Sequence, residues 1–285
     1  MYQINHLENE TQAKTKIVLR GTAQLEKFPQ AKEAFLKAAA RWEVLINNDV
    51  TITIDVDFGT TFFGATFGNN TLGATASRRL LYDYDLVRAG LLTTAANEEE
   101  ANLYNLLPIT PVPTDIKDKR RNQIPMIEAN TAVLRTLGLF NSSSGLADAT
   151  IGFNSNFAFD FDPSNGIDVN SIDFDGVAVH EIGHALGFTS RTGFLDFSIA
   201  QLPALSTWDL FRFRPDVTLS TFSTASRTLS TGGEQRFFIG GTPLALSTGS
   251  TTLGGDGRQT SHWKDDLLEG NLIGVMDPTL SRGQR

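Results

Sequence analysis

The segment Val177 to Ser190, VAVHEIGHALGFTS, constrains this chain most, because it holds two histidines four residues apart with a glutamate beside the first. Residues four apart lie on one face of an α-helix, so the rings of His180 and His184 can converge on one cation. Glu181 is well placed to take a proton from a water bound to that cation. The spacing therefore predicts the HExxH metal site of a zinc-dependent hydrolase.

The residues around this motif also favour a helix. Asp173 precedes it as an N-cap, and Gly187 suits the positive φ that ends a helix and turns the chain away. HExxH can arise by chance on a helix with two histidines, but a regular apolar face argues against chance here. The apolar residues at helical spacing are Ala178, Ile182, Ala185 and Leu186.

A third zinc ligand is needed, and its position is not obvious. In motifs extended to HExxHxxGxxH a histidine follows the glycine by three residues, but this chain has Ser190 there. Only His6 and His262 remain among its four histidines, and His6 lies in a polar N-terminal segment that reads as frayed or exposed. A carboxylate is the alternative to His262. The carboxylate candidates are Asp196, Asp209, Glu234 and Glu269.

The order of these motifs resembles that of the leishmanolysin-type metzincin proteases. HEIGHALGF is followed, after a long insertion, by His262 and Trp263 and then by a methionine in a turn. The resemblance rests on residues 170 to 190 and 260 to 280. It implies three zinc ligands, a general base and a Met-turn residue that underlies the metal. In this chain they are His180, His184 and His262, Glu181, and Met276.

The resemblance also implies a fold and an activity. We expect an α+β zincin with two lobes around a cleft: residues 1–190 with a mixed twisted sheet that ends in the zinc helix, and residues 191–285 with the insertion, the third ligand and the Met turn. The implied function is zinc endopeptidase activity on a polypeptide bound in extended form along an edge strand. One departure is that no tyrosine follows Met276 to assist the oxyanion, which leaves zinc itself or an arginine such as Arg282.

Hydrophobic periodicity predicts the elements before the helix. Alternating apolar residues predict strands, and apolar residues at helical spacing predict helices. Residues 149–157 are the strand nearest the zinc helix in sequence and our candidate for the edge strand that binds substrate. The predicted elements are strands at 16–19, 50–58 and 149–157, helices at 28–46, 96–107 and 130–139, a loop or hairpin at 59–73, and short strands with turns at 218–257.

An oxygen-rich loop, FDFDPSNGID, precedes the zinc helix and is a candidate calcium site. Its match to an EF-hand is poor, because the glycine falls one position late and Ser171 stands in place of the closing glutamate. A capped turn with solvated carboxylates is the alternative interpretation. The candidate ligands are Asp160, Asp162, Asn165 and Asp168.

Composition limits the partners and the compartment. A net charge of -8 and a pI near 5.0 argue against nucleic acid as the main partner. The absence of cysteine excludes a disulfide framework and a thiolate metal site. We find no signal-peptide pattern and no apolar run near the ~20 residues of a membrane helix. A cytoplasmic protein is one interpretation, but we expect the mature form of a secreted bacterial protein.

Two other functions stay open at this point. The chain could be a catalytically silent zinc-binding module for adhesion or interaction, or a zinc hydrolase of non-peptide amides. Glu181 separates the first of these from the protease, because a silent module has no need of a general base. Its presence in the motif favours an enzyme.

Overall fold

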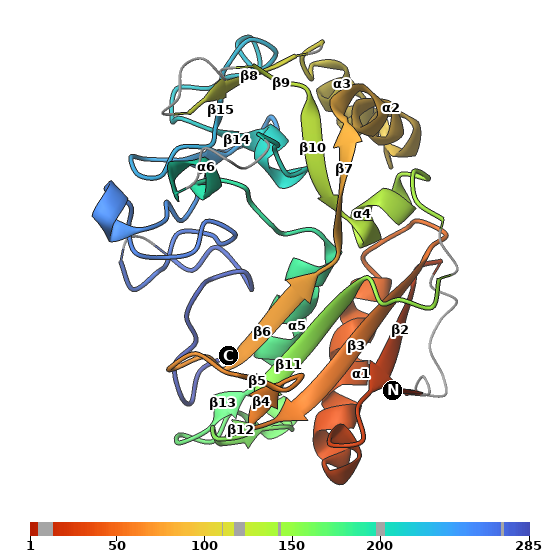
Figure 1. Ribbon diagram of the computed structural model, residues 1–285. Helices are drawn as coiled ribbons and strands as arrows, with labels where there is room; N and C mark the ends of the chain where they lie inside the picture. Colours follow the sequence, from red (N-terminus) through yellow and green to blue (C-terminus); the bar gives the residue numbers. More distant parts are fainter. Residues whose placement is uncertain (5–13, 110, 117–122, 142–143, 198–202, 269–270) are drawn as a thin grey trace.

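A mixed five-stranded sheet forms the centre of the first lobe (Figure 1). Its middle strands run parallel, and the two outer strands pair antiparallel with their neighbours. In spatial order the strands are β1 (Tyr2–Gln3), β2 (Lys16–Gly21), β3 (Thr51–Gly59), β11 (Ala149–Asn154) and β6 (Gly73–Ser77). The computed structural model describes residues 1–4, 14–109, 111–116, 123–141, 144–197, 203–268 and 271–285.

Two helices cover one face of this sheet and close the first core. α1 (Pro29–Glu43) begins with proline at its first turn, where no intrahelical donor is lost, and it packs against α5 (Phe174–Leu186). Phe35, Phe153 and Phe174 meet between the helices and the sheet, with ring centroids 4.6 to 5.0 Å apart. Burying each such ring stabilises the fold by roughly 1.5–3 kcal/mol. The expected α+β class with a mixed sheet is confirmed for this lobe.

The strands predicted at 16–19, 50–58 and 149–157 and the helix predicted at 28–46 are confirmed as β2, β3, β11 and α1. The assignment of the edge strand was wrong. β11 lies between β3 and β6, and four of its six residues in succession are buried, as is typical of an internal strand. The edge is β6, whose GATAS sequence lacks the apolar alternation that would have predicted a strand.

The second lobe is built around a long antiparallel ribbon of β7 (Arg79–Asp83) and β10 (Met126–Asn130), and β7 leads up from β6 in Figure 1. Three helices pack beside the ribbon, of which the first was not predicted. They are α2 (Tyr84–Thr94), α3 (Glu98–Asn105) and α4 (Thr131–Thr136). A small sheet of β8 (Val112–Asp115), β9 (Gln123–Ile124) and β15 (Arg227–Thr228) completes this lobe.

The segment that follows α5, the predicted insertion, packs on this ribbon. The second core joins apolar residues of 84–139 to those of 205–238. The division of the chain at residue 190 stays a prediction. The insertion itself is made of short elements, as predicted. They are α6 (Phe194–Phe197), the 3₁₀ turn Trp208–Phe211, and a sheet of β14 (Arg212–Phe213), β16 (Arg236–Phe237) and β17 (Leu244–Ala245).

The remaining elements are short. The predicted loop or hairpin at 59–73 contains the hairpin of β4 (Thr61–Phe62) and β5 (Ala65–Thr66). β12 (Phe159–Asp160) pairs with β13 (Ile172–Asp173) just before α5. Single 3₁₀ turns lie at Leu25–Lys27, Pro163–Asn165 and Thr251–Leu253. Within the part of the chain that the structure describes, no helix combines the length and the apolar character needed to cross a membrane.

Candidate metal centre

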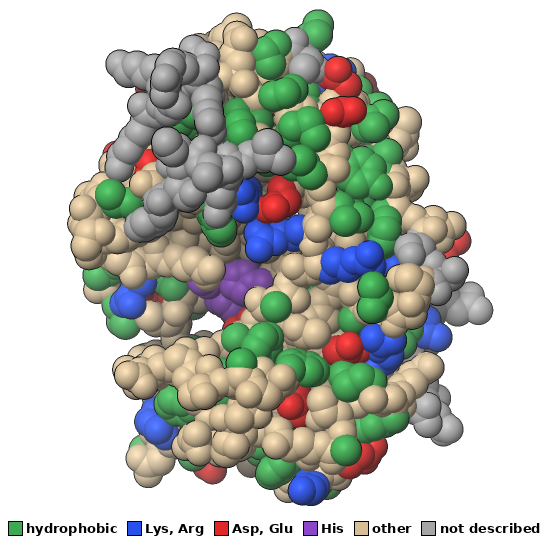
Figure 2. Space-filling view, viewed as in Figure 1, with side chains coloured by type: hydrophobic (Ala, Val, Ile, Leu, Met, Phe, Trp, Pro, Cys, Tyr) green, Lys and Arg blue, Asp and Glu red, His purple; other side chains and the backbone are tan. Residues whose placement is uncertain are grey.

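Three histidines from distant parts of the chain meet in the hollow between the lobes (Figure 2). His180 and His184 belong to α5, and His262 follows the insertion. The Nε2 atom of His180 lies 3.1 Å from that of His184, and His262 Nε2 lies 3.2 Å from both. A tetrahedral ion with metal–nitrogen bonds of 2.0–2.1 Å would separate neighbouring ligand atoms by about 3.3–3.4 Å. The three nitrogens therefore fit a tetrahedral metal with its fourth position free for another ligand.

The other nitrogen of each ring is fixed by the backbone. The Nδ1 atom of His180 lies 2.7 Å from the Val275 carbonyl oxygen. That of His184 lies 2.7 Å from the Phe188 carbonyl oxygen, and that of His262 lies 3.0 Å from the Gln259 carbonyl oxygen. A carbonyl oxygen only accepts, so each Nδ1 carries the hydrogen and donates. In the neutral rings each Nε2 then presents a lone pair to the same point. Three lone pairs this close repel one another unless a cation lies between them.

Burial favours the neutral form of His184 and His262. Burial lowers the pKa of His262 to about 4, and the neighbouring His180 ring lowers it further. Burial also lowers the pKa of His184 well below its usual range, with added effects from His180 and His262. Metal binding requires the neutral imidazole, so both residues are ready to coordinate at neutral pH.

We predict that the metal-free protein loses stability as the pH falls from about 6.5 to about 4. The pKa of His262 is about 4 in the fold and near 6.5 in an unfolded chain, so the unfolded chain binds more protons in this window. The free energy of unfolding therefore rises with pH there, by about 3 kcal/mol for this residue. Urea unfolding of chelator-treated protein at several pH values measures it. His262→Ala should flatten the dependence, and an unchanged slope in that variant would contradict the assignment.

The glutamate of the motif is buried beside the histidines. Glu181 is 6% exposed, and its Oε2 accepts a hydrogen bond of 2.6 Å from Thr75 Oγ1 on β6. Burial raises the pKa of this carboxyl, while His180 and the Thr75 hydroxyl act in the opposite direction. A carboxylate with a raised pKa is a stronger base toward a water molecule.

Met276 packs against α5 and contacts the residue that follows His262. A Cβ atom on Gly183 would lie 2.5 Å from Met276 Sδ, so the helix needs glycine at this point for the sulfur to approach. The Met276 carbonyl accepts a hydrogen bond of 3.0 Å from the Trp263 amide, next to His262. Its neighbour Val275 accepts from His180. The turn thus contacts His180 directly and, on the other side of the site, the residue that follows His262.

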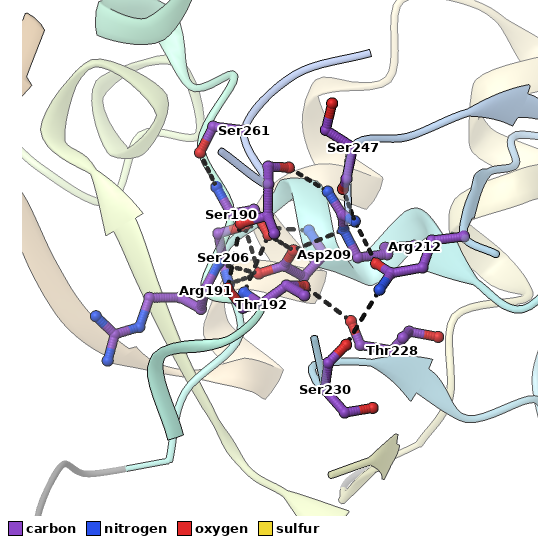
Figure 3. A network of polar contacts seen from close by, with 12 residues as sticks. Ser190, Arg191, Thr192, Ser206, Asp209, Arg212, Thr228, Ser230, Ser247 and Ser261 are labelled. Carbon is purple, nitrogen blue, oxygen red and sulfur yellow. Dashed lines mark hydrogen bonds and ion pairs between the residues drawn. The ribbon is translucent and has the colours of Figure 1, made fainter. Parts of the chain in front are cut away.

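Ser190, which stands where a shorter motif would have its third histidine, belongs to a buried polar network (Figure 3). Its Oγ donates to Asp209 Oδ1 at 2.6 Å, and its amide donates to Ser261 Oγ at 2.9 Å. Asp209 and Arg212 are fully buried and form an ion pair at 3.5 Å. Arg212 also donates to the Thr260 carbonyl.

This network determines where the third histidine lies. Thr260 and Ser261 immediately precede His262, and both are bonded to residues of the insertion or of the segment just after α5. A buried charge is costly unless it is paired, so Asp209 and Arg212 hold this arrangement firmly. Burial lowers the pKa of Arg212 to about 10, which leaves it charged at neutral pH.

Among the described residues, none of the alternative carboxylates belongs to the group of possible metal ligands that contains His180 and His184. Asp209 is part of the buried network, and Asp196 Oδ2 accepts from the Thr231 amide at 2.7 Å. Glu234 forms an ion pair with Arg236. Glu269 and His6 lie outside the described residues.

The loop proposed for calcium uses its oxygens in local turns. Asp160 accepts from the amides of Asp162 and Asp168, both at 2.9 Å, and Asp162 accepts from Ser164. Asn165 ends the 3₁₀ turn that Asp162 caps. In the described chain, the carboxylates of this loop are not among the groups of three whose ligand atoms lie within 4.8 Å of one another. Calcium binding stays a prediction, and the capped turn is the feature observed.

A cleft of about 1650 Å³ surrounds the histidines. β6 and the residues before it line one part of the cleft, and residues of 259–267 and 272–285 line another. Arg282 lines the cleft and donates to the Asn170 carbonyl. The free edge of β6, which pairs only with β11 in the described sheet, lies along this cleft beside Glu181.

Three site residues were not found from the sequence. The sequence did contain a sign of the role of Gly183, because a glycine inside a helix costs stability and often marks a close contact with another segment. Gly73 and Thr75 had none, since their role depends on β6 lying against α5.

Comparisons of the chain with family models, with curated proteins and with solved structures gave no match.

Proposed function

We propose that this protein is a zinc-dependent endopeptidase with a metzincin-like fold. The observation that carries the proposal is the convergence of three imidazole nitrogens beside a buried carboxylate. Nitrogen ligands in tetrahedral arrangement are typical of zinc, and three protein ligands with an open fourth position are typical of catalytic rather than structural zinc. His180, His184 and His262 would hold the ion, and Met276 would support it from below.

Glu181 would carry the proton chemistry. Zinc, when bound at such a site, polarises the scissile carbonyl and lowers the pKa of a water molecule to about 7. Glu181 takes the proton of the attacking water and later gives it to the leaving amine. Burial raises the pKa of Glu181, which makes its carboxylate a stronger base toward the attacking water. The Nδ1 contacts of the three histidines keep the rings oriented during the reaction.

The substrate would be an extended polypeptide that pairs with the outer edge of β6. Such an edge offers unpaired backbone groups that hydrogen-bond any peptide, whatever its sequence. β6 borders the cleft along its whole length and contacts Glu181 through Thr75. A bound strand would therefore pass the histidines with its backbone in reach of the general base. Secretion and a bacterial source stay predictions.

Metal analysis combined with a proteolysis assay tests this proposal. We expect about one zinc per chain, cleavage of an unfolded protein, loss of cleavage after treatment with a zinc chelator, and recovery when zinc is restored. Two matched substrates, a peptide and a non-peptide amide of similar size, separate a peptidase from a general amide hydrolase.

Two outcomes would argue for other functions. A zinc-loaded protein that cleaves no peptide would indicate the silent binding module. A protein that takes up no zinc at neutral pH would overturn the metal assignment itself. The buried Glu181, held by a specific hydrogen bond, favours the enzyme over the silent module.

A further inference from the structure

We propose that Thr75 is a positioning residue for the general base and holds the carboxyl group of Glu181 in its productive orientation. The inference rests on the proposed peptidase function, and it concerns a residue outside the zinc motif. Thr75 lies on β6, 106 residues before Glu181, and reaches it across the boundary between the sheet and α5. β6 and α5 are in contact along this boundary.

The geometry points to a single strong hydrogen bond. Thr75 Oγ1 lies 2.6 Å from Glu181 Oε2 and 3.0 Å from the Glu181 carbonyl oxygen. A hydroxyl has one hydrogen to donate, and hydrogen bonds to an ionised oxygen are shorter and stronger than those to a neutral one. The hydrogen is therefore donated to the carboxylate, and Oε2 becomes the anchored oxygen.

The other oxygen stays free for chemistry. In the described structure Oε1 lies beside Gly73, where an added Cβ atom would come within 3.2 Å of it and within 3.0 Å of Phe153. Glycine at this point leaves Oε1 unobstructed. A proton that arrives on Oε1 does not disturb the bond between Thr75 and Oε2. The same contact can thus fix the carboxyl group both as base and as acid.

The hydrogen bond from Thr75 would preorganise the carboxyl group of Glu181 for proton transfer. The terminal torsion of a glutamate is broad, so an unanchored carboxyl group samples many orientations. A positioned base contributes more to the reaction than a mobile one of the same pKa. Because Thr75 belongs to the strand proposed to bind the peptide, it also sets Glu181 in register with that strand.

Thr75→Val tests the inference, because valine keeps the shape and loses the hydroxyl. We expect kcat per bound zinc to fall by about 10- to 100-fold, the value for a lost hydrogen bond to a charged group. KM, zinc content and melting temperature should stay close to those of the wild type. Thr75→Ser should recover most of kcat. Thr53→Val on β3 is the matched control, with the same change in the same sheet and no contact with Glu181 in the described structure.

Several results would overturn the inference. They are an unchanged kcat in Thr75→Val, an equal loss in Thr75→Ser, or a loss that disappears when the rate is expressed per bound zinc. If the valine variant does not fold, Thr75→Ala removes the same hydroxyl and is judged by the same measurements. Failure of the proposed function looks different, because the wild type itself would then cleave no peptide.

Discussion

Glutamine in place of Glu181 is expected to leave zinc bound and to lower kcat for peptide hydrolysis by about 10²- to 10⁴-fold, the usual contribution of a general base. Glutamine has nearly the same shape and can still accept the Thr75 hydrogen bond through its side-chain oxygen. It cannot take a proton from water. The three histidines are untouched, so the zinc content should equal that of the wild type.

The measurement pairs zinc analysis with initial rates on an unfolded protein. Asp266→Asn is the control, because Asp266 is an exposed acidic residue that lines the same cleft. It should keep the rate of the wild type. A Glu181→Gln protein as active as the wild type would show that another group removes the proton and would remove Glu181 from the proposed mechanism.

Alanine in place of His262 is expected to weaken zinc binding by more than the ~10- to 100-fold that follows loss of an outer-sphere partner, because a direct ligand is removed. The two histidines of α5 alone give an incomplete set for a catalytic zinc site. Activity should fall with occupancy at low zinc concentration. Titration with a competing chelator gives the zinc affinity.

Gln259→Ala serves as the control for this variant. Gln259 is exposed and contacts His262 through its backbone carbonyl, which the substitution keeps. Its zinc affinity should match the wild type. Unaltered zinc affinity in His262→Ala would show that the third ligand lies elsewhere, and the carboxylates of the insertion would return as candidates.

The local parts of the site could be predicted from the sequence. His180, Glu181 and His184 are fixed relative to one another by helix geometry alone, and Gly187 ends the helix with a φ of 125°. α1 and β3 were likewise predicted from periodicity, because each buries one face.

Long-range contacts could not be predicted in the same way. The position of His262 depends on Asp209 and Arg212, whose buried pairing has no signature in the sequence. β6 was missed because its small residues carry no alternation, and β11 was misplaced because strand order is not encoded within a strand. α2 contacts α3, β7 and β10 and joins a core that also contains residues of 205–238, so its partners were not evident from its own residues.

The distance along the chain between His184 and His262 means that the two residues are synthesised at different times. His262 follows His184 by 78 residues, so at ~5–20 residues per second the third ligand leaves the ribosome roughly 4–16 s after the helix. In the folded protein its neighbour Ser261 is bonded to Ser190, which lies before the insertion. Under the proposed function, a newly made chain would carry its general base without a complete zinc site. Under the same proposal, the cell that makes the protein would be exposed to its activity only once His262 had been synthesised and had reached the site.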